Sequence, residues 1–116
     1  MDSQQAKEIV IEFITLINDE HFKEARKYAD DGMTFRGVLG SRDGADEYFA
    51  DMEKMKLKYA VIKTIADGDD VCVFYNLDMS GANIFGCGWY EVREGKIVSL
   101  KVIFDPRPVL EKQGKK

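Results

Sequence analysis

The spacing of hydrophobic and polar residues changes about halfway along the chain. Up to about residue 56 apolar side chains recur every three or four positions, which predicts amphipathic helices. From residue 57 onward they alternate with polar ones, which predicts strands. The most regular stretch is residues 85–105, two β-rich runs joined by Arg-Glu-Gly-Lys, in which Gly95 supplies the positive φ that a tight hairpin turn requires. We therefore predict a long β-hairpin there.

Three helices are predicted before the strands. The first begins at Asp2 or Ser3, with Gln5 in the capping-box position. A second, shorter helix follows residues 18–20 and ends near Gly32. The apolar face of the first helix comprises Ile9, Val10, Phe13, Ile14 and Ile17, and that of the third comprises Ala45, Tyr48, Phe49, Met52 and Met55. Each helix therefore has one face that must be buried against something else.

The remaining segments complete an α+β domain. Residues 33–36 are expected to form a short strand, 37–43 a loop, and 57–66 and 71–79 two paired strands. Three N-terminal helices packed on the concave side of a curved antiparallel sheet would leave a pocket where the layers diverge. The glycine pair Gly86 and Gly88 suits sheet curvature or close backbone approach. We expect one domain over residues 1–116, with its core at about 8–105 and a tail at 106–116.

Composition excludes several classes of function. The net charge of −4 argues against nucleic acid as a partner, because phosphate binding draws on clustered Lys and Arg. No apolar run is long enough to span a bilayer, and residues 1–5 lack the start of a secretory signal, so a cytoplasmic protein is expected. Two cysteines without metal-ligand spacing, and no phosphate-binding loop, predict neither a metal nor another cofactor.

Several short motifs occur in a characteristic order. They are Ala29-Asp30-Asp31, Gly44 at the start of the third helix, the segment from Ile65 to Val71 with its central Asp-Gly, the segment from Glu94 to Val98, and Phe104-Asp105. In these motifs, over about residues 8–105, the chain resembles the nuclear transport factor two-like superfamily. That superfamily includes ketosteroid isomerase, SnoaL-like polyketide cyclases and limonene epoxide hydrolase. The resemblance implies a cone-shaped sheet wrapped on three helices, a cavity inside, and often a dimer across the outer face of the sheet.

The resemblance also indicates where the isomerase would keep its catalytic groups. That enzyme uses an aspartate base and an oxyanion hole made of a tyrosine and a protonated aspartate. In this chain the base position falls near Arg36, the tyrosine position on Phe13, and the protonated-acid position on or beside Gly88. None of these side chains can perform the corresponding role, so steroid-type isomerisation is not expected.

The other two activities of the superfamily are incomplete by the same comparison. The hydrolase needs an arginine and an aspartate two apart on one strand, where this chain has Asn76 and Asp78, and a further aspartate near Val102. A cyclase would also need an acidic residue at the Val102 position. Asp105 matches a terminal aspartate common in these families, either as an acid–base group or as a residue that fixes the strand end.

Strand alternation sorts the two faces of the sheet. With Gly88 and Val102 facing inward, the residues expected on the inner face are Gly86, Tyr90, Val98, Leu100 and Phe104 and, by the family register, Cys72, Phe74, Asn76 and Asp78. The residues expected on the outer face are Phe85, Cys87, Trp89, Lys101 and Ile103. Because Phe85, Trp89 and Ile103 are too apolar to leave in water, we predict a homodimer through this face.

Three functional interpretations remain open. The first is a domain whose apolar cavity binds a small apolar or amphipathic molecule. The ligand-binding residues expected for it are Phe13, Tyr48, Asn76, Gly88, Tyr90 and Val102. The second is an isomerase, cyclase or hydrolase that uses Asp78 or Asp105 as its acid–base group, with Arg36 stabilising an anion; Asp78 and Arg36 could instead form an ordinary ion pair. The third is a dimerising interaction module without catalytic activity.

Overall fold

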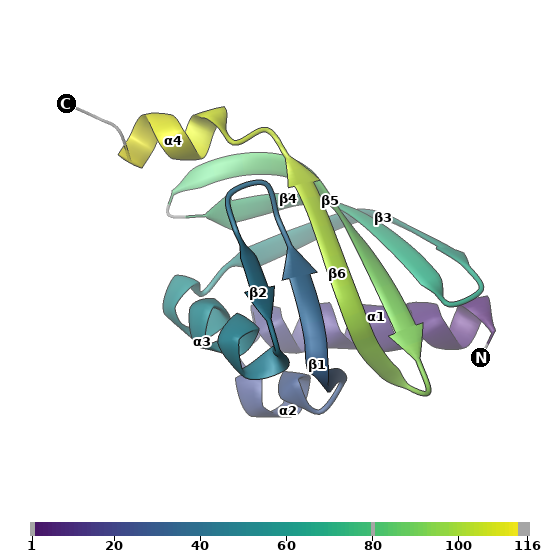
Figure 1. Cartoon of the computed structure of the whole chain (residues 1–116). Coiled ribbons are helices and arrows are strands. Elements are labelled where there is room, and N and C mark those ends of the chain that lie inside the picture. Colours follow the sequence, from purple (N-terminus) through teal and green to yellow (C-terminus); the bar gives the residue numbers. More distant parts are fainter. Residues whose placement is uncertain (1, 80, 114–116) are drawn as a thin grey trace.

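The fold is a curved six-stranded sheet with helices packed on one side (Figure 1). The computed structural model describes residues 2–79 and 81–113. The helices are α1 (Ser3–Asn18), α2 (Phe22–Arg26), α3 (Ala45–Met55) and α4 (Arg107–Gln113). The strands are β1 (Ala29–Arg36), β2 (Ser41–Asp43), β3 (Lys58–Asp67), β4 (Asp70–Met79), β5 (Ala82–Arg93) and β6 (Lys96–Phe104). The predicted α+β class, with three N-terminal helices on a curved sheet, is confirmed.

The strand order is β2-β1-β6-β5-β4-β3. The sheet was predicted to be antiparallel throughout, and this is wrong: it is mixed, since β1 runs parallel to β6. Helix α1 packs on β3 and β4, and α3 packs on β1 and β2. Both helices therefore cover the same, inner face of the sheet, while no element of the described residues forms a layer over its outer face (Figure 1).

Several predicted boundaries need correction. Gly32 lies inside β1 rather than at the end of a helix, so this strand is longer than the predicted segment 33–36. The predicted loop 37–43 ends in β2, which pairs with β1 to make a hairpin. The predicted tail begins with α4, whose Val109 is buried against Ala82 and Ile84. Strand β2 and helix α4 are too short to produce a periodic pattern of their own, and the buried residues of β1, Ala29 and Met33, lie four positions apart rather than alternating.

Local signals placed α1 and the long hairpin correctly. The Asp2 carboxylate accepts a hydrogen bond from the Gln5 backbone N–H at 2.8 Å, and the Gln5 side chain accepts one from the Asp2 N–H at 3.1 Å. This reciprocal pair is the predicted capping box. In the β5–β6 turn Glu94 and Gly95 have φ values of 51° and 80°, the two consecutive positive values of a type I′ turn. The apolar face of α1 is buried as predicted at Val10, Phe13, Ile14 and Ile17, and Ile9 is half-buried.

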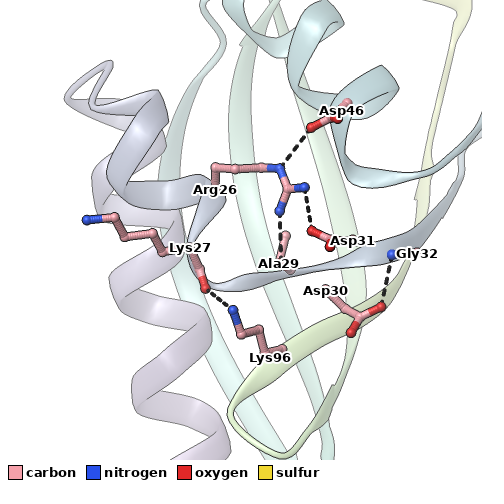
Figure 2. A network of polar contacts seen from close by, with 8 residues as sticks. All are labelled: Arg26, Lys27, Ala29, Asp30, Asp31, Gly32, Asp46 and Lys96. Atoms are coloured by element: carbon pink, nitrogen blue, oxygen red, sulfur yellow. Dashed lines mark hydrogen bonds and ion pairs between the residues drawn. The ribbon is translucent and has the colours of Figure 1, made fainter.

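An arginine at the end of α2 fixes the two shorter N-terminal helices to the sheet (Figure 2). The Arg26 guanidinium donates to the Asp46 carboxylate of α3 at 3.1 Å, to the Asp31 carboxylate of β1 at 2.7 Å and to the Ala29 carbonyl at 3.1 Å. The hydrogen bond and charge of Arg26 lower the pKa of Asp31. One side chain thus ties α2, β1 and α3 together and sets the position of α3 over the sheet.

Candidate functional site

A small cavity lies between α3, β2 and the inner face of the sheet. Its volume is about 80 Å³. The residues that line it are Phe35, Arg42, Tyr48, Asp51, Met52, Met55, Leu57, Tyr59, Tyr75, Leu77, Met79, Val102 and Phe104. Most of these side chains are apolar, and the five polar ones are three tyrosines, one arginine and one aspartate. A few polar groups in an apolar cavity is the usual composition of a small-molecule site.

The three tyrosines supply the hydroxyl groups of the cavity. Tyr48 comes from α3, Tyr59 from β3 and Tyr75 from β4. The rings of Tyr59 and Tyr75 meet edge to face, with centroids 4.9 Å apart. Burial raises the pKa of all three phenols well above the ordinary value, so they remain neutral. They can therefore donate and accept hydrogen bonds but bring no charge into the cavity.

The charged residues of the cavity form one ion pair at its mouth. Arg42 Nε lies 2.5 Å from Asp51 Oδ2, and their side chains are 42% and 31% exposed. Arg42 belongs to β2, and its guanidinium also donates to the Ser41 carbonyl at 2.7 Å. Asp51 belongs to α3, where Tyr48, Asp51 and Met55 lie at helical spacing on one face. The pair therefore links β2 to α3 across the entrance.

A backbone clamp fixes the position of Tyr59. The Asn18 side-chain amide donates to the Tyr59 carbonyl at 2.9 Å and accepts from the Tyr59 backbone N–H at 2.8 Å. This two-bond contact joins the end of α1 to the start of β3. It holds β3 at the register that points the Tyr59 ring toward the cavity.

The glycines of β5 make room for Tyr75 rather than for a ligand. A methyl group on Gly88 would lie 3.0 Å from Cε1 of Tyr90, 3.3 Å from Leu100 Cδ1 and 3.4 Å from the Tyr75 hydroxyl. A methyl group on Gly86 would lie 3.3 Å from the Tyr75 ring. Close backbone approach at the glycine pair is thus confirmed, but protein side chains fill the space beside it.

The structure brings together only part of the predicted ligand-binding set. Tyr48 and Val102 line the cavity. Phe13 and Tyr90 are each 1% exposed and pack edge to face on one another, which places them in the core. Arg42, Asp51, Tyr59 and Tyr75 complete the site and were missed. The spacing of Asp51 relative to Tyr48 was the sequence signal that could have identified one of them.

The predicted inward orientation of Asn76 and Asp78 is wrong. The residues of β4 that face the helices are Val71, Val73, Tyr75 and Leu77, all buried, whereas Asn76 and Asp78 are exposed. Cys72 and Phe74 share their face. The register taken from the family is therefore wrong by one residue in β4. The observed register buries valine, tyrosine and leucine, and it keeps the Asn76 amide and the Asp78 carboxylate in water.

The predicted partners Asp78 and Arg36 do not meet. Arg36 donates to Asp43 at 2.8 Å, while the Asp78 carboxylate accepts from the Gly81 N–H at 3.2 Å. Strands β1 and β4 are separated by β6 and β5, which puts the two residues at least roughly 14 Å apart across the sheet. Neither the proposed base–anion arrangement nor the alternative ion pair forms between them.

The predicted inward orientation of Val98 is also wrong, because a β-bulge interrupts the strand pairing beside it. The register of β5 against β6 shifts between Glu91 and Val92, so that Ile97 rather than Val98 faces the core. Beyond the bulge Leu100, Val102 and Phe104 face inward as predicted, while Lys101 and Ile103 face outward. The bulge inserts one extra residue, which reverses the alternation of side chains on one side of it, and a prediction from strict alternation cannot include this.

The carboxylate of Asp105 is held by a neighbouring arginine. Asp105 accepts four hydrogen bonds from Arg107, three from its guanidinium at 2.7 to 3.1 Å and one from its backbone N–H at 3.0 Å. The guanidinium hydrogen bonds are the main reason that the pKa of Asp105 falls from 3.8 to about 2. Such a carboxylate is a weak base at neutral pH, and its contacts hold the start of α4.

This depressed pKa makes a testable pH prediction. Because the folded-state pKa lies below the unfolded value, ionised Asp105 stabilises the fold above about pH 4, and this contribution is lost as the pH falls toward about 2. Arg107→Gln should move the Asp105 titration midpoint, followed by carboxyl ¹³C NMR, from about 2 up toward 3.8. An unchanged midpoint would show that Arg107 does not cause the shift.

The predicted dimer residues lie together on the outer face of the sheet. Phe85, Trp89 and Ile103 are 60%, 41% and 69% exposed. Lys101 stacks over the Trp89 ring with its Nζ 4.7 Å from the centroid, and the Trp89 N–H donates to Asp70 at 3.0 Å. An open groove of about 590 Å³ crosses this face and continues beneath Pro108. The groove is larger than the inner cavity, but it is an open surface feature, and its lining includes the polar side chains of Asn83 and Asp105.

Two classes of feature are missing from the described part of the chain. Among residues 2–79 and 81–113, no helix is long and apolar enough to cross a membrane. Within the same ranges no three His, Cys, Asp or Glu side chains converge in a way that could hold a metal ion.

Comparisons with known proteins agree with the geometry. Residues 10–100 match the family model of the SnoaL-like domain. An NTF2-like protein of unknown function from Cytophaga hutchinsonii is 44% identical, with a TM-score of 0.90, over 91% of this chain and 95% of that one. A Mycobacterium tuberculosis LEH-like epoxide hydrolase is 18% identical, with a TM-score of 0.79, over 98% of both chains. A de novo designed protein with a curved β-sheet is 19% identical, with a TM-score of 0.80, over 97% of this chain and 93% of that one. No curated protein matches the sequence significantly.

Proposed function

The chain belongs to the SnoaL-like domain family, and we propose that it is a member that binds a small molecule in the cavity between α3 and the sheet. The observation that carries this proposal is the composition of the cavity wall. Three neutral tyrosines and one ion pair line a space whose other walls are methionine, phenylalanine and aliphatic side chains. Such a space suits a molecule with an apolar body and one polar group.

The size of the cavity limits the ligand. Its volume of about 80 Å³ is roughly half of the 150 Å³ that takes up benzene and well below the ~300 Å³ of a drug-sized site. A molecule of about two or three heavy atoms therefore fits the cavity as it stands, whereas a steroid or a polyketide does not. A molecule as large as isobutanol, which is comparable in size to benzene, enters if the cavity widens. Met52, Met55 and Met79 line the cavity, and methionine side chains repack easily enough to allow this.

Binding is better supported than catalysis. A general base near the cavity must be free to accept a proton within hydrogen-bond reach of the substrate. Asp51 is already paired with the guanidinium of Arg42, and Asp105 is a weak base with a pKa of about 2. The buried tyrosines are held neutral by their raised pKa. The isomerase, cyclase or hydrolase alternative consequently lacks an available base at this site.

A titration with isobutanol tests the proposal. We expect its addition to shift the ¹H–¹⁵N resonances of residues around Tyr48 and Val102 in the wild-type protein. Val102→Phe should abolish the shifts because the larger ring fills the cavity, while Ile103→Val, one residue away on the outer face, should leave them unchanged. Equal binding by wild type and Val102→Phe, or shifts confined to the outer face, would count against the cavity as the site.

We also propose that the outer face pairs with a second copy of the chain. The support is the set of exposed apolar side chains at Phe85, Trp89 and Ile103, bordered by charged residues such as Lys101. An apolar centre with a polar rim is the usual composition of a protein interface.

Two free thiols, Cys72 and Cys87, on the same face are in keeping with a reducing cytoplasmic location.

Sedimentation velocity tests the dimer. The wild type should sediment with about twice the 13.2 kDa mass of one chain, and Ile103→Asp should sediment as a monomer. Ile62→Lys is a matched control, because Ile62 is also exposed, at 56%, but lies on the edge strand β3. A wild-type monomer at high concentration, or an Ile103→Asp dimer, would contradict the proposal.

A further inference from the structure

The cavity mouth carries one positive and one negative side chain that neutralise each other. Arg42 and Asp51 are the charged residues among those lining the cavity, with Nε and Oδ2 2.5 Å apart. We propose that this ion pair makes the cavity select an uncharged ligand, a short-chain alcohol, ketone or amide, over a carboxylate or an amine of the same shape. This inference rests on the proposed binding function and specifies the chemical class of the ligand.

The position of the pair prevents either charge from acting alone. A ligand carboxylate that approached Arg42 would also approach the Asp51 carboxylate, which lies against Nε of the same guanidinium and would repel it. An ammonium group that approached Asp51 would meet Arg42 in the same way. The attraction and the repulsion offset each other, so a charged ligand would gain little to compensate for the water it gives up.

The interior of the cavity offers no other charge. Beyond the mouth the polar atoms are the hydroxyls of Tyr48, Tyr59 and Tyr75, which burial keeps protonated. A hydroxyl can donate to a carbonyl oxygen and accept from an O–H or N–H, so it satisfies a neutral polar group in either sense. A buried ion needs a partner of opposite charge, and the remaining walls are apolar.

Matched ligands of one shape provide the test. Isobutyramide and isobutyrate have nearly the same shape, as do isobutanol and isobutylammonium, and within each pair the main difference is the charge of the terminal polar group. By NMR titration at neutral pH the wild type should bind each neutral member about tenfold more tightly than its charged counterpart. Asp51→Asn, which frees Arg42, should bind isobutyrate about fivefold more tightly than the wild type does. Arg42→Gln, which frees Asp51, should do the same for isobutylammonium.

The outcomes separate this inference from the proposed function. If the wild type binds the charged and neutral members equally, or if neither variant changes the ranking, the ion pair does not select the ligand, although the cavity still binds it. If the wild type binds none of the four probes, the binding function fails and the inference fails with it. Both variants replace partly exposed side chains, and their ¹H–¹⁵N spectra show directly whether the fold is retained.

Discussion

Replacing Phe13 by alanine is expected to destabilise the protein by about 3–5 kcal/mol. The Phe13 ring is 1% exposed and meets Phe49 of α3 and Tyr90 of β5 edge to face, with centroids 5.9 and 6.2 Å away. It therefore joins α1, α3 and the sheet at one point. Because a domain of this size has a total stability of about 5–15 kcal/mol, the variant should be close to unfolding at 25 °C. Urea denaturation followed by circular dichroism measures the loss.

Two variants on the same helix show whether the loss belongs to this ring. Glu12→Ala changes the adjacent, exposed residue and should alter the free energy of unfolding by less than about 0.5 kcal/mol. Phe13→Leu keeps much of the buried volume and should lose less than half as much as Phe13→Ala. A loss below about 1 kcal/mol for Phe13→Ala would show that Phe13 borders an open space, as the sequence-based assignment to the ligand site implied.

The sequence predicted best what neighbouring residues decide among themselves. The capping box of α1, its buried face and the positive φ of Gly95 each depend on residues within a few positions of one another. The period of the pattern also separated the helices from the strands. These local preferences agree with the final packing, which is why they could be predicted without knowledge of the rest of the chain.

The sequence predicted poorly which of the two alternating sets of side chains in a strand faces the core. In β4 one set contains Tyr75 and the other Phe74, so aromatic residues occur on both faces. The family register favoured the set with Asn76 and Asp78, and the residues themselves favoured the opposite set because it contains no amide or carboxylate. The physical rule that buried polar groups need partners should have outweighed the register taken from relatives.

The candidate site could not be assembled from the sequence because its residues meet only in three dimensions. Arg42 belongs to a strand of three residues, and Asp51 is a charged residue within the apolar stripe of α3. Nothing local shows that these two side chains form a pair. Tyr59 is positioned by Asn18, which lies 41 residues earlier in the chain. Contacts of this kind follow from how α1 and α3 sit on the sheet, and so they emerge after the fold is known.

Gly88→Ala is expected to destabilise the protein by about 1–3 kcal/mol. The added methyl group would lie 3.0 Å from Cε1 of Tyr90 and 3.3 Å from Cδ1 of Leu100, both fully packed in the core. Neither side chain can move away without disturbing further contacts, because protein interiors are close-packed. The loss should appear in urea denaturation as a lower midpoint with an unchanged slope, since the extent of the folded state does not change.

The same substitution connects the core to the cavity. The methyl group would also meet the Tyr75 hydroxyl at 3.4 Å, so any shift of the backbone that relieves the closer contacts should displace the Tyr75 ring, which lines the cavity. We therefore expect Gly88→Ala to weaken isobutanol binding as well as stability. Gly40→Ala is the matched control, because its nearest contact is 3.7 Å away on a flexible arginine side chain, and it should change neither property. If Gly88→Ala were as stable as the wild type, Tyr75 and Tyr90 could move aside at no energetic cost, and the glycine would not be required for their packing.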